Sequence, residues 1–170
     1  MKKIKLVIFV ATILLFQNCI NWGIDGGEVI EGRMNYEPVV IQRSEFEAST
    51  FIENTPRSIE NSGKIYVKGN FIFINEVNKG FHVINNTDPA NPVNIGFIQV
   101  LGSSDLSIKN TVFYANNARD LIAFTLDESN ESLTITKRIA NVFPQIWTPD
   151  GPVYFGVGED EIVVDWIPAD

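Results

Sequence analysis

The stretch KIYVKGNFIFINEVNKGFHVI, residues 64–84, decides the fold class of this chain. Its three apolar segments are separated by turns at Gly69-Asn70 and at Asn78-Lys79-Gly80, and they lie at residues 65–67, 71–74 and 81–84. Glycine and asparagine are favoured in tight turns, and short apolar runs between turns are typical of β-strands. We therefore predict an antiparallel meander of three strands.

The pattern of this stretch returns twice, with a period of about 40 residues. Phe73, Tyr114 and Tyr154 are 41 and 40 residues apart. The same spacings separate three positions on the third strand, Val83, Phe124 and Val164. A fourth strand is expected to follow in each of the first two copies, at residues 93–100 and 133–139.

Four short strands in a unit of this length are typical of a β-propeller blade, in which each blade packs against the next. We predict an all-β, propeller-type domain over residues 36–170, with units at about 64–103, 104–142 and 143–170. The alternative is a single β-sandwich, because evenly spaced short strands also suit that fold.

The number of units predicts an open ring. Full propellers have 4 to 8 blades, whereas this chain has about two and a half, the last with strands at 153–155 and 162–164. A strand expected at residues 39–46 resembles the fourth strand of a preceding blade, and the last blade with which it would close a ring is missing. We therefore expect either a partial gene product or self-association through open blade faces.

Several segments resemble the LVIVD-repeat proteins. They are residues 64–73, 80–85 and 88–93, together with DLIAF at residues 120–124, which is similar to the strand that names the family. Residues 36–47 resemble the leader of LVIVD lipoproteins from Bacteroidetes-type bacteria. The resemblance implies a β-propeller body on an exported, often lipid-anchored chain, and it implies no catalytic residues.

The N-terminus predicts export. A basic segment at residues 1–5 precedes an apolar run, residues 6–16, that is too short to span a membrane. Cys19, the single cysteine, follows this run where a bacterial lipoprotein carries its lipid. We predict a signal peptide at residues 1–18, lipidation of Cys19, and a flexible, glycine-rich tether at residues 19–35. The expected location is the cell envelope, at the outer membrane or the cell surface. The alternative is an ordinary signal peptide with a free thiol.

The charge balance excludes one class of partner. The chain has 13 basic and 21 acidic residues, and loss of residues 1–18 would change the net charge from −8 to about −11. Nucleic acids are therefore not expected as partners. The expected partners are a membrane, through the lipid anchor, and a protein or glycan ligand.

Polar residues in equivalent turns of successive blades would lie on one rim, which makes them candidates for a binding surface. The candidates are Asn75, Glu76, Asn116, Asn117 and Arg119, with Trp147 or Trp166 as a platform on which a ligand stacks. The alternative is that asparagine is present because turns favour it.

No combination of residues predicts catalysis, a metal site or a cofactor. His82 is the single histidine, and we interpret it as structural because a metal site needs three or four ligands. Residues 159–161, EDE, lack the ligand spacing of calcium loops and are interpreted as a solvated hairpin tip. We expect a non-enzymatic binding module. The alternatives are a propeller hydrolase or lyase that acts on a polysaccharide, and a nonfunctional fragment.

Overall fold

The opening meander is part of a five-stranded antiparallel sheet. The computed structural model describes residues 35–127, 132–151 and 156–169. The first sheet has the strand order β2-β6-β5-β4-β3. Its strands are β2 (Phe51–Glu53), β3 (Ser62–Lys68), β4 (Phe71–Glu76), β5 (Gly80–Asn85) and β6 (Val93–Gln99). The turn between β4 and β5 uses a positive φ at Asn78 (60°) and at Gly80 (148°), as expected for asparagine and glycine.

A second meander follows directly in the chain. Its strand order is β10-β9-β8-β7, all antiparallel. The strands are β7 (Leu106–Lys109), β8 (Val112–Asn117), β9 (Asp120–Leu126) and β10 (Leu133–Ile139). The predicted all-β class and the predicted antiparallel meanders are confirmed, while no sheet in the described ranges closes on itself.

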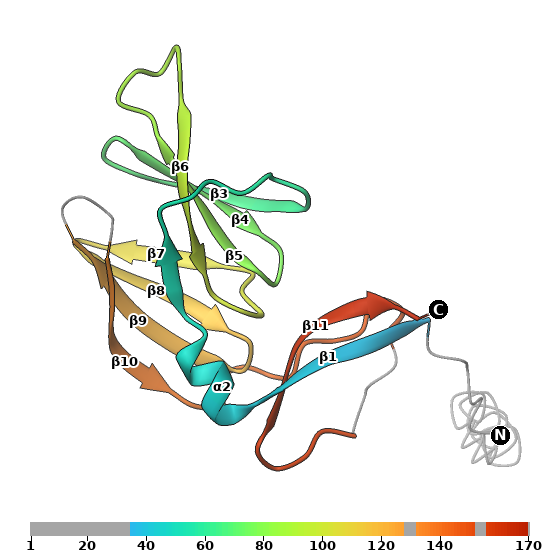
Figure 1. The fold of residues 1–170 in the computed structure, drawn as a ribbon. Coiled ribbons are helices and arrows are strands. Elements are labelled where there is room, and N and C mark those ends of the chain that lie inside the picture. The colour runs from blue at the N-terminus through green and yellow to red at the C-terminus, as the bar shows by residue number, and fades with distance from the viewer. Residues whose placement is uncertain (1–34, 128–131, 152–155, 170) are drawn as a thin grey trace, which may run out of the picture. The chain divides into compact units, whose positions relative to one another are not determined.

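The strand at the N-terminal end of the described chain pairs with the strand at its C-terminal end. β1 (Tyr36–Gln42) and β11 (Glu161–Pro168) form a two-stranded antiparallel sheet, seen in Figure 1, with one register shift between Val39 and Val40. The last blade, with which this N-terminal strand would pair, was expected to be missing, whereas in the described structure the strand pairs with β11. The strand expected at residues 153–155 lies outside the described residues.

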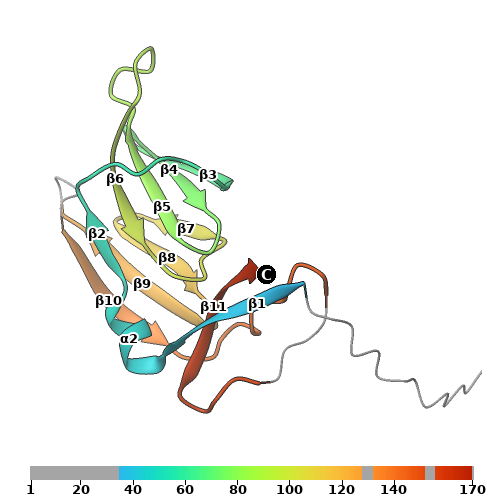
Figure 2. The ribbon, with the colours of Figure 1, turned by 45° about the vertical axis from the view of Figure 1, so that its right-hand side comes forward.

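The prediction of a strand over residues 39–46 was wrong at the C-terminal end of the strand. It stops at Gln42, and Arg43–Ala48 form the helix α2, which Figure 2 shows between β1 and β2. The sequence RSEFEA contains no β-branched residue and has an acidic residue, Glu45, in the first turn, and both features favour a helix. Phe46 on this helix is fully buried. In the described ranges, no helix is long and apolar enough to cross a membrane.

The main core contains side chains from both meanders. Phe73 from β4 contacts Phe113 from β8 edge to face at 5.2 Å between ring centroids, and Phe113 stacks on Phe124 of β9 at the same distance. Val83 and Ile122 are buried in the same cluster. Because strand side chains alternate in direction, the neighbours of Phe113 on β8 point to the opposite face of the second sheet.

Candidate functional site

Equivalent positions of the two meanders carry different side chains. Strand pairing places three residues of the first sheet in one row and three residues of the second sheet in the matching row: Tyr66, Phe73 and Val83 against Ser107, Tyr114 and Ala123. The expected match of Val83 with Phe124 was wrong, because Ala123 takes that position. The β8–β9 hairpin joins Asn117 to Asp120, one residue fewer than the β4–β5 hairpin.

The two rows differ in whether they are covered. The row of the first sheet packs against the second sheet, where Tyr66, Phe73 and Val83 belong to the main core. The row of the second sheet points away from the first sheet, and its side chains are on average smaller and more polar. A groove with a volume of about 790 Å³ lies over Ser107 and Tyr114, within the usual range for ligand sites.

Residues 143–147 form one wall of this groove. The wall is fixed at two points, because the Phe143 backbone N–H donates to the Arg119 carbonyl (2.9 Å) and Trp166 Nε1 donates to the Ile146 carbonyl (3.1 Å). Trp147 is 64% exposed, whereas Trp166 is only 7% exposed. Of the two tryptophans considered as stacking platforms, only Trp147 is therefore accessible in the described structure.

Asn116 shapes the floor of the groove. Its Oδ1 accepts the backbone N–H groups of Ser104 and Asp105, both at 2.9 Å, and its Nδ2 donates to the Gly102 carbonyl at 2.9 Å. These bonds hold the loop that precedes β7. Within the described ranges, the hydroxyls of Ser107 and Tyr114 have no hydrogen-bond partner and face the groove.

Asp105 is the charged residue at the edge of the groove. Its carboxylate accepts hydrogen bonds from Lys64 Nζ and from the Tyr66 hydroxyl (2.6 Å). These two bonds, of which the bond from Lys64 has the larger effect, hold the pKa of Asp105 below its ordinary value. Burial and the bond to Asp105 raise the pKa of Tyr66 to about 12. The charge of Asp105 is therefore already compensated within the chain.

The five residues considered for a rim surface have different environments. Asn75, Glu76 and Asn117 are 1%, 3% and 0% exposed, so they do not offer an accessible surface in the described structure. Asn75 Nδ2 donates to the Gly80 carbonyl (3.0 Å), and Asn117 Nδ2 donates to the Leu101 carbonyl (2.7 Å). Arg119 is half-buried in the β8–β9 turn, and Asn116 alone of the five lines the groove.

Ser107 and Tyr114 line the groove although the sequence did not predict them as site residues. The sequence indicates Tyr114 only as a position of the 40-residue period. A comparison of the two rows would have found both, because a serine stands where the first unit has Tyr66 and a tyrosine stands where it has Phe73. A more polar side chain at the matching position of the second meander is a signal that the sequence itself contains.

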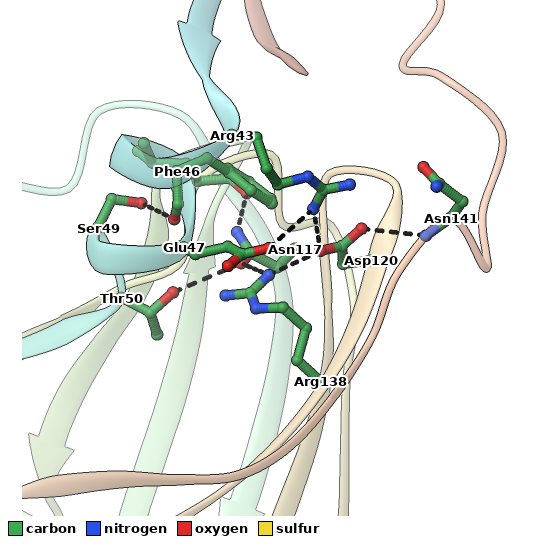
Figure 3. A network of polar contacts seen from close by, with 10 residues as sticks. Arg43, Phe46, Glu47, Ser49, Thr50, Asn117, Asp120, Arg138 and Asn141 are labelled. Carbon is green, nitrogen blue, oxygen red and sulfur yellow. Dashed lines mark hydrogen bonds and ion pairs between the residues drawn. The ribbon is translucent and has the colours of Figure 1, made fainter. Parts of the chain in front are cut away.

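A second polar cluster surrounds Asp120 at the base of α2 (Figure 3). The carboxylate is fully buried and accepts from Arg43 Nη1 (2.5 Å), Arg138 Nη1 (2.9 Å) and the Asn141 backbone N–H (3.1 Å). Burial raises the pKa of Asp120, but the bonds from Arg43, Asn141 and Arg138 together outweigh burial and hold it below the ordinary value. Both guanidinium groups also lie over the Phe46 ring. These contacts join α2 to the second sheet.

The other residues considered for chemistry have partners within the chain. His82 is fully buried, and its Nε2 lies 3.0 Å from Glu76 Oε2. Residues 159–160 form a turn in which the Gly158 backbone N–H donates to Glu161 Oε2 at 2.9 Å. In the described ranges, no three histidine, cysteine or acidic side chains come together as metal ligands would. Cys19 lies outside the described residues.

Comparison with known proteins adds no relative: no family model matches the chain, and neither the curated proteins nor the solved structures contain a match.

Proposed function

We propose that this chain is an exported, lipid-anchored binding module built from β-propeller-type repeats, and that the groove on the second sheet is its ligand site. The observation that carries the proposal is the difference between the two rows of equivalent positions. The row of the first sheet fills a core, whereas Ser107 and Tyr114 of the other row line a groove together with the exposed Trp147. A largely apolar groove with a few polar groups is the usual form of a ligand site.

Two features support propeller-type repeats. Two consecutive four-stranded meanders follow each other in the chain and share one core, as neighbouring blades do. β1 pairs with β11 in the way that a propeller uses a terminal strand to complete its last blade. A third unit would then contain β11 and β1.

The lipid anchor rests on the sequence of residues 1–19. Acylation of Cys19 would hold the protein on a membrane and leave the groove outside the cytoplasm. Mass spectrometry of the N-terminal peptide from the membrane fraction tests this, with a Cys19→Ser variant as the control. An unmodified Cys19 would show that the anchor is wrong.

The binding function is tested by screening the full chain against arrays of glycans and peptides, with bound ligand and released product measured together. We expect saturable binding without turnover, weakened by Trp147→Ala. Release of shortened polysaccharide would instead favour the alternative of a hydrolase or lyase. If neither binding nor turnover were found, the alternative of a nonfunctional fragment would be favoured.

A further inference from the structure

We infer that the groove on the second sheet binds a neutral saccharide, an inference that rests on the binding function proposed above. Three properties of the described residues that line the groove support a neutral saccharide: their charge, their aromatic surface and their hydrogen-bonding groups.

The charge of the lining favours a neutral ligand. Among the described residues that line the groove, Asp105 is the only acidic or basic side chain, and Lys64 and Tyr66 already bind its carboxylate. A cationic ligand would have to compete with Lys64 for this group. An anionic ligand would meet no basic side chain among the described residues that line the groove, and the chain as a whole carries a net charge of −8.

The aromatic surface of the groove suits the apolar face of a sugar ring. Trp147 is 64% exposed and Phe143 is 37% exposed, both on the wall, and Tyr114 lies on the floor. An indole ring offers a flat apolar surface together with one N–H donor, so it can contact the C–H groups of a pyranose and still bind its hydroxyls. An exposed tryptophan of this kind, placed at a groove, is suited to anchor a ligand.

The free polar groups match sugar hydroxyls. Ser107 and Tyr114 lie directly opposite each other on β7 and β8, and each hydroxyl both donates and accepts. Asn78 also lines the groove, and its Nδ2 donates to Asp165 Oδ1 (2.8 Å), while no hydrogen bond within the described ranges uses its Oδ1 acceptor. Sugar hydroxyls likewise donate and accept, so they can satisfy all three groups.

A peptide fits this groove less well. Peptides that bind as an added strand need the free backbone edge of a sheet. The floor carries Tyr114 on β8, which is paired on both sides, and Ser107 on β7, which is the edge strand of this sheet. Both side chains project from the face of the sheet, so a ligand in contact with them lies over that face and not along the free backbone edge of β7. The observations therefore favour a saccharide over an extended peptide.

Isothermal titration calorimetry on the full chain tests the inference. The probes are neutral oligosaccharides of glucose, xylose and mannose, with oligogalacturonate as the anionic probe, chitosan oligomers as the cationic probe, and extended peptides. We expect binding of at least one neutral oligosaccharide, weakened about 30-fold by Trp147→Ala and about 3- to 10-fold by Tyr114→Phe, which removes only the hydroxyl. The control is Phe51→Ala, an exposed aromatic on β2, which should leave the affinity unchanged.

The possible results separate this inference from the proposed function. Binding of neutral oligosaccharides that is insensitive to both Trp147→Ala and Tyr114→Phe would overturn the inference. Binding of peptides or charged oligosaccharides alone, with sensitivity to Trp147→Ala, would overturn the inference and leave the binding function standing. No binding of any probe would count against both. Circular dichroism of each variant confirms that a loss of affinity is not a loss of fold.

Discussion

Glu76 is a buried carboxylate that three neighbours hold in its charged form. Its oxygens accept from the backbone N–H groups of Asn61 (2.6 Å) and Glu60 (3.1 Å), and His82 Nε2 lies 3.0 Å away. Burial raises the pKa of Glu76, but the bonds to His82, Asn61 and Glu60 together outweigh it and hold the pKa below the ordinary value of 4.5. The side chain thereby fixes the segment that leads into β3.

The Glu76→Gln variant should lose stability in a pH-dependent way. The pKa of Glu76 is lower in the folded than in the unfolded chain, so its carboxylate stabilises the fold fully at pH values above the pKa of the unfolded chain. This contribution disappears as the pH falls through the pKa of the folded chain. We expect the variant to be about 2 kcal/mol less stable at pH 7, the usual size for hydrogen bonds to a charged group, with the difference shrinking in acid. Urea unfolding at a series of pH values measures it.

Glu60→Gln is the matched control for this experiment. Glu60 is an exposed glutamate whose carboxylate lies 3.5 Å from Lys79 Nζ, so its loss should leave the stability nearly unchanged. A difference between Glu76→Gln and the unmodified chain that stays constant from neutral to acidic pH would contradict the assigned role of the charge.

At the scale of the element, α2 depends on tertiary contacts. The helix has six residues and no side-chain cap, so its own hydrogen bonds cannot keep it folded. It is held by Phe46, which is fully buried, and by Arg43, which binds the buried carboxylate of Asp120. Arg138 binds the same carboxylate from the end of β10, so one acidic side chain joins a helix, a hairpin and a strand.

Replacing Asp120 should therefore destabilise the second sheet and α2 together. Asp120→Asn removes the buried counter-charge that Arg43 and Arg138 share, and it leaves Arg43 only the exposed Glu47, 3.6 Å away. We expect a loss of about 3 to 5 kcal/mol, the usual cost of removing one partner of a buried ion pair. Thermal and urea unfolding measure it, and hydrogen exchange should show α2 opening more readily.

The control for Asp120→Asn is Asp160→Asn, an exposed aspartate in the turn before β11. That change should have little effect. If the two variants were equally stable, the cluster around Asp120 would not join these elements in the way we describe.

Most of the strands could be predicted from the sequence, whereas β2, α2 and the terminal pairing could not. Apolar runs between Gly-Asn turns placed β3, β4 and β5 correctly, because strand signals of this kind are local. The segment containing Phe46 is too short to show a helical period, so one buried phenylalanine suited either a strand or a helix. The partner of β1 is more than 100 residues away in the chain, and a single sequence does not record such a contact.

The groove could be predicted only in part. Trp147 and Asn116 were both considered as site residues, and both line it. Asn75, Glu76 and Asn117 were also considered, but their polar atoms hold loops and backbone within the chain. Sequence position alone places a polar residue near a turn, whereas the direction of the side chain depends on the register of the hairpin, which differs by one residue between the two sheets.

At the scale of the whole molecule, the first sheet has an outer face with exposed apolar side chains. Ile65 and Val67 on β3 are 65% and 66% exposed, and they point away from the face that carries Tyr66. In a stack of similar units, this face of one unit is covered by the preceding unit. In the described structure it has no such cover, and an uncovered face of this kind favours association.

We therefore predict that the chain self-associates through the face carrying Ile65 and Val67, with a second copy as the partner. The acidic net charge of −8 opposes this association, so added salt should strengthen it by screening the repulsion. The double variant Ile65→Lys and Val67→Lys should shift the population to monomer. Sedimentation velocity over a wide range of concentration and salt measures the shift.

The control is the Ile139→Lys variant, which changes an exposed apolar residue at the end of β10 in the other sheet and should associate like the unmodified chain. A chain that stays monomeric at every concentration, or an association that both sets of variants weaken equally, would show that this face is not the interface.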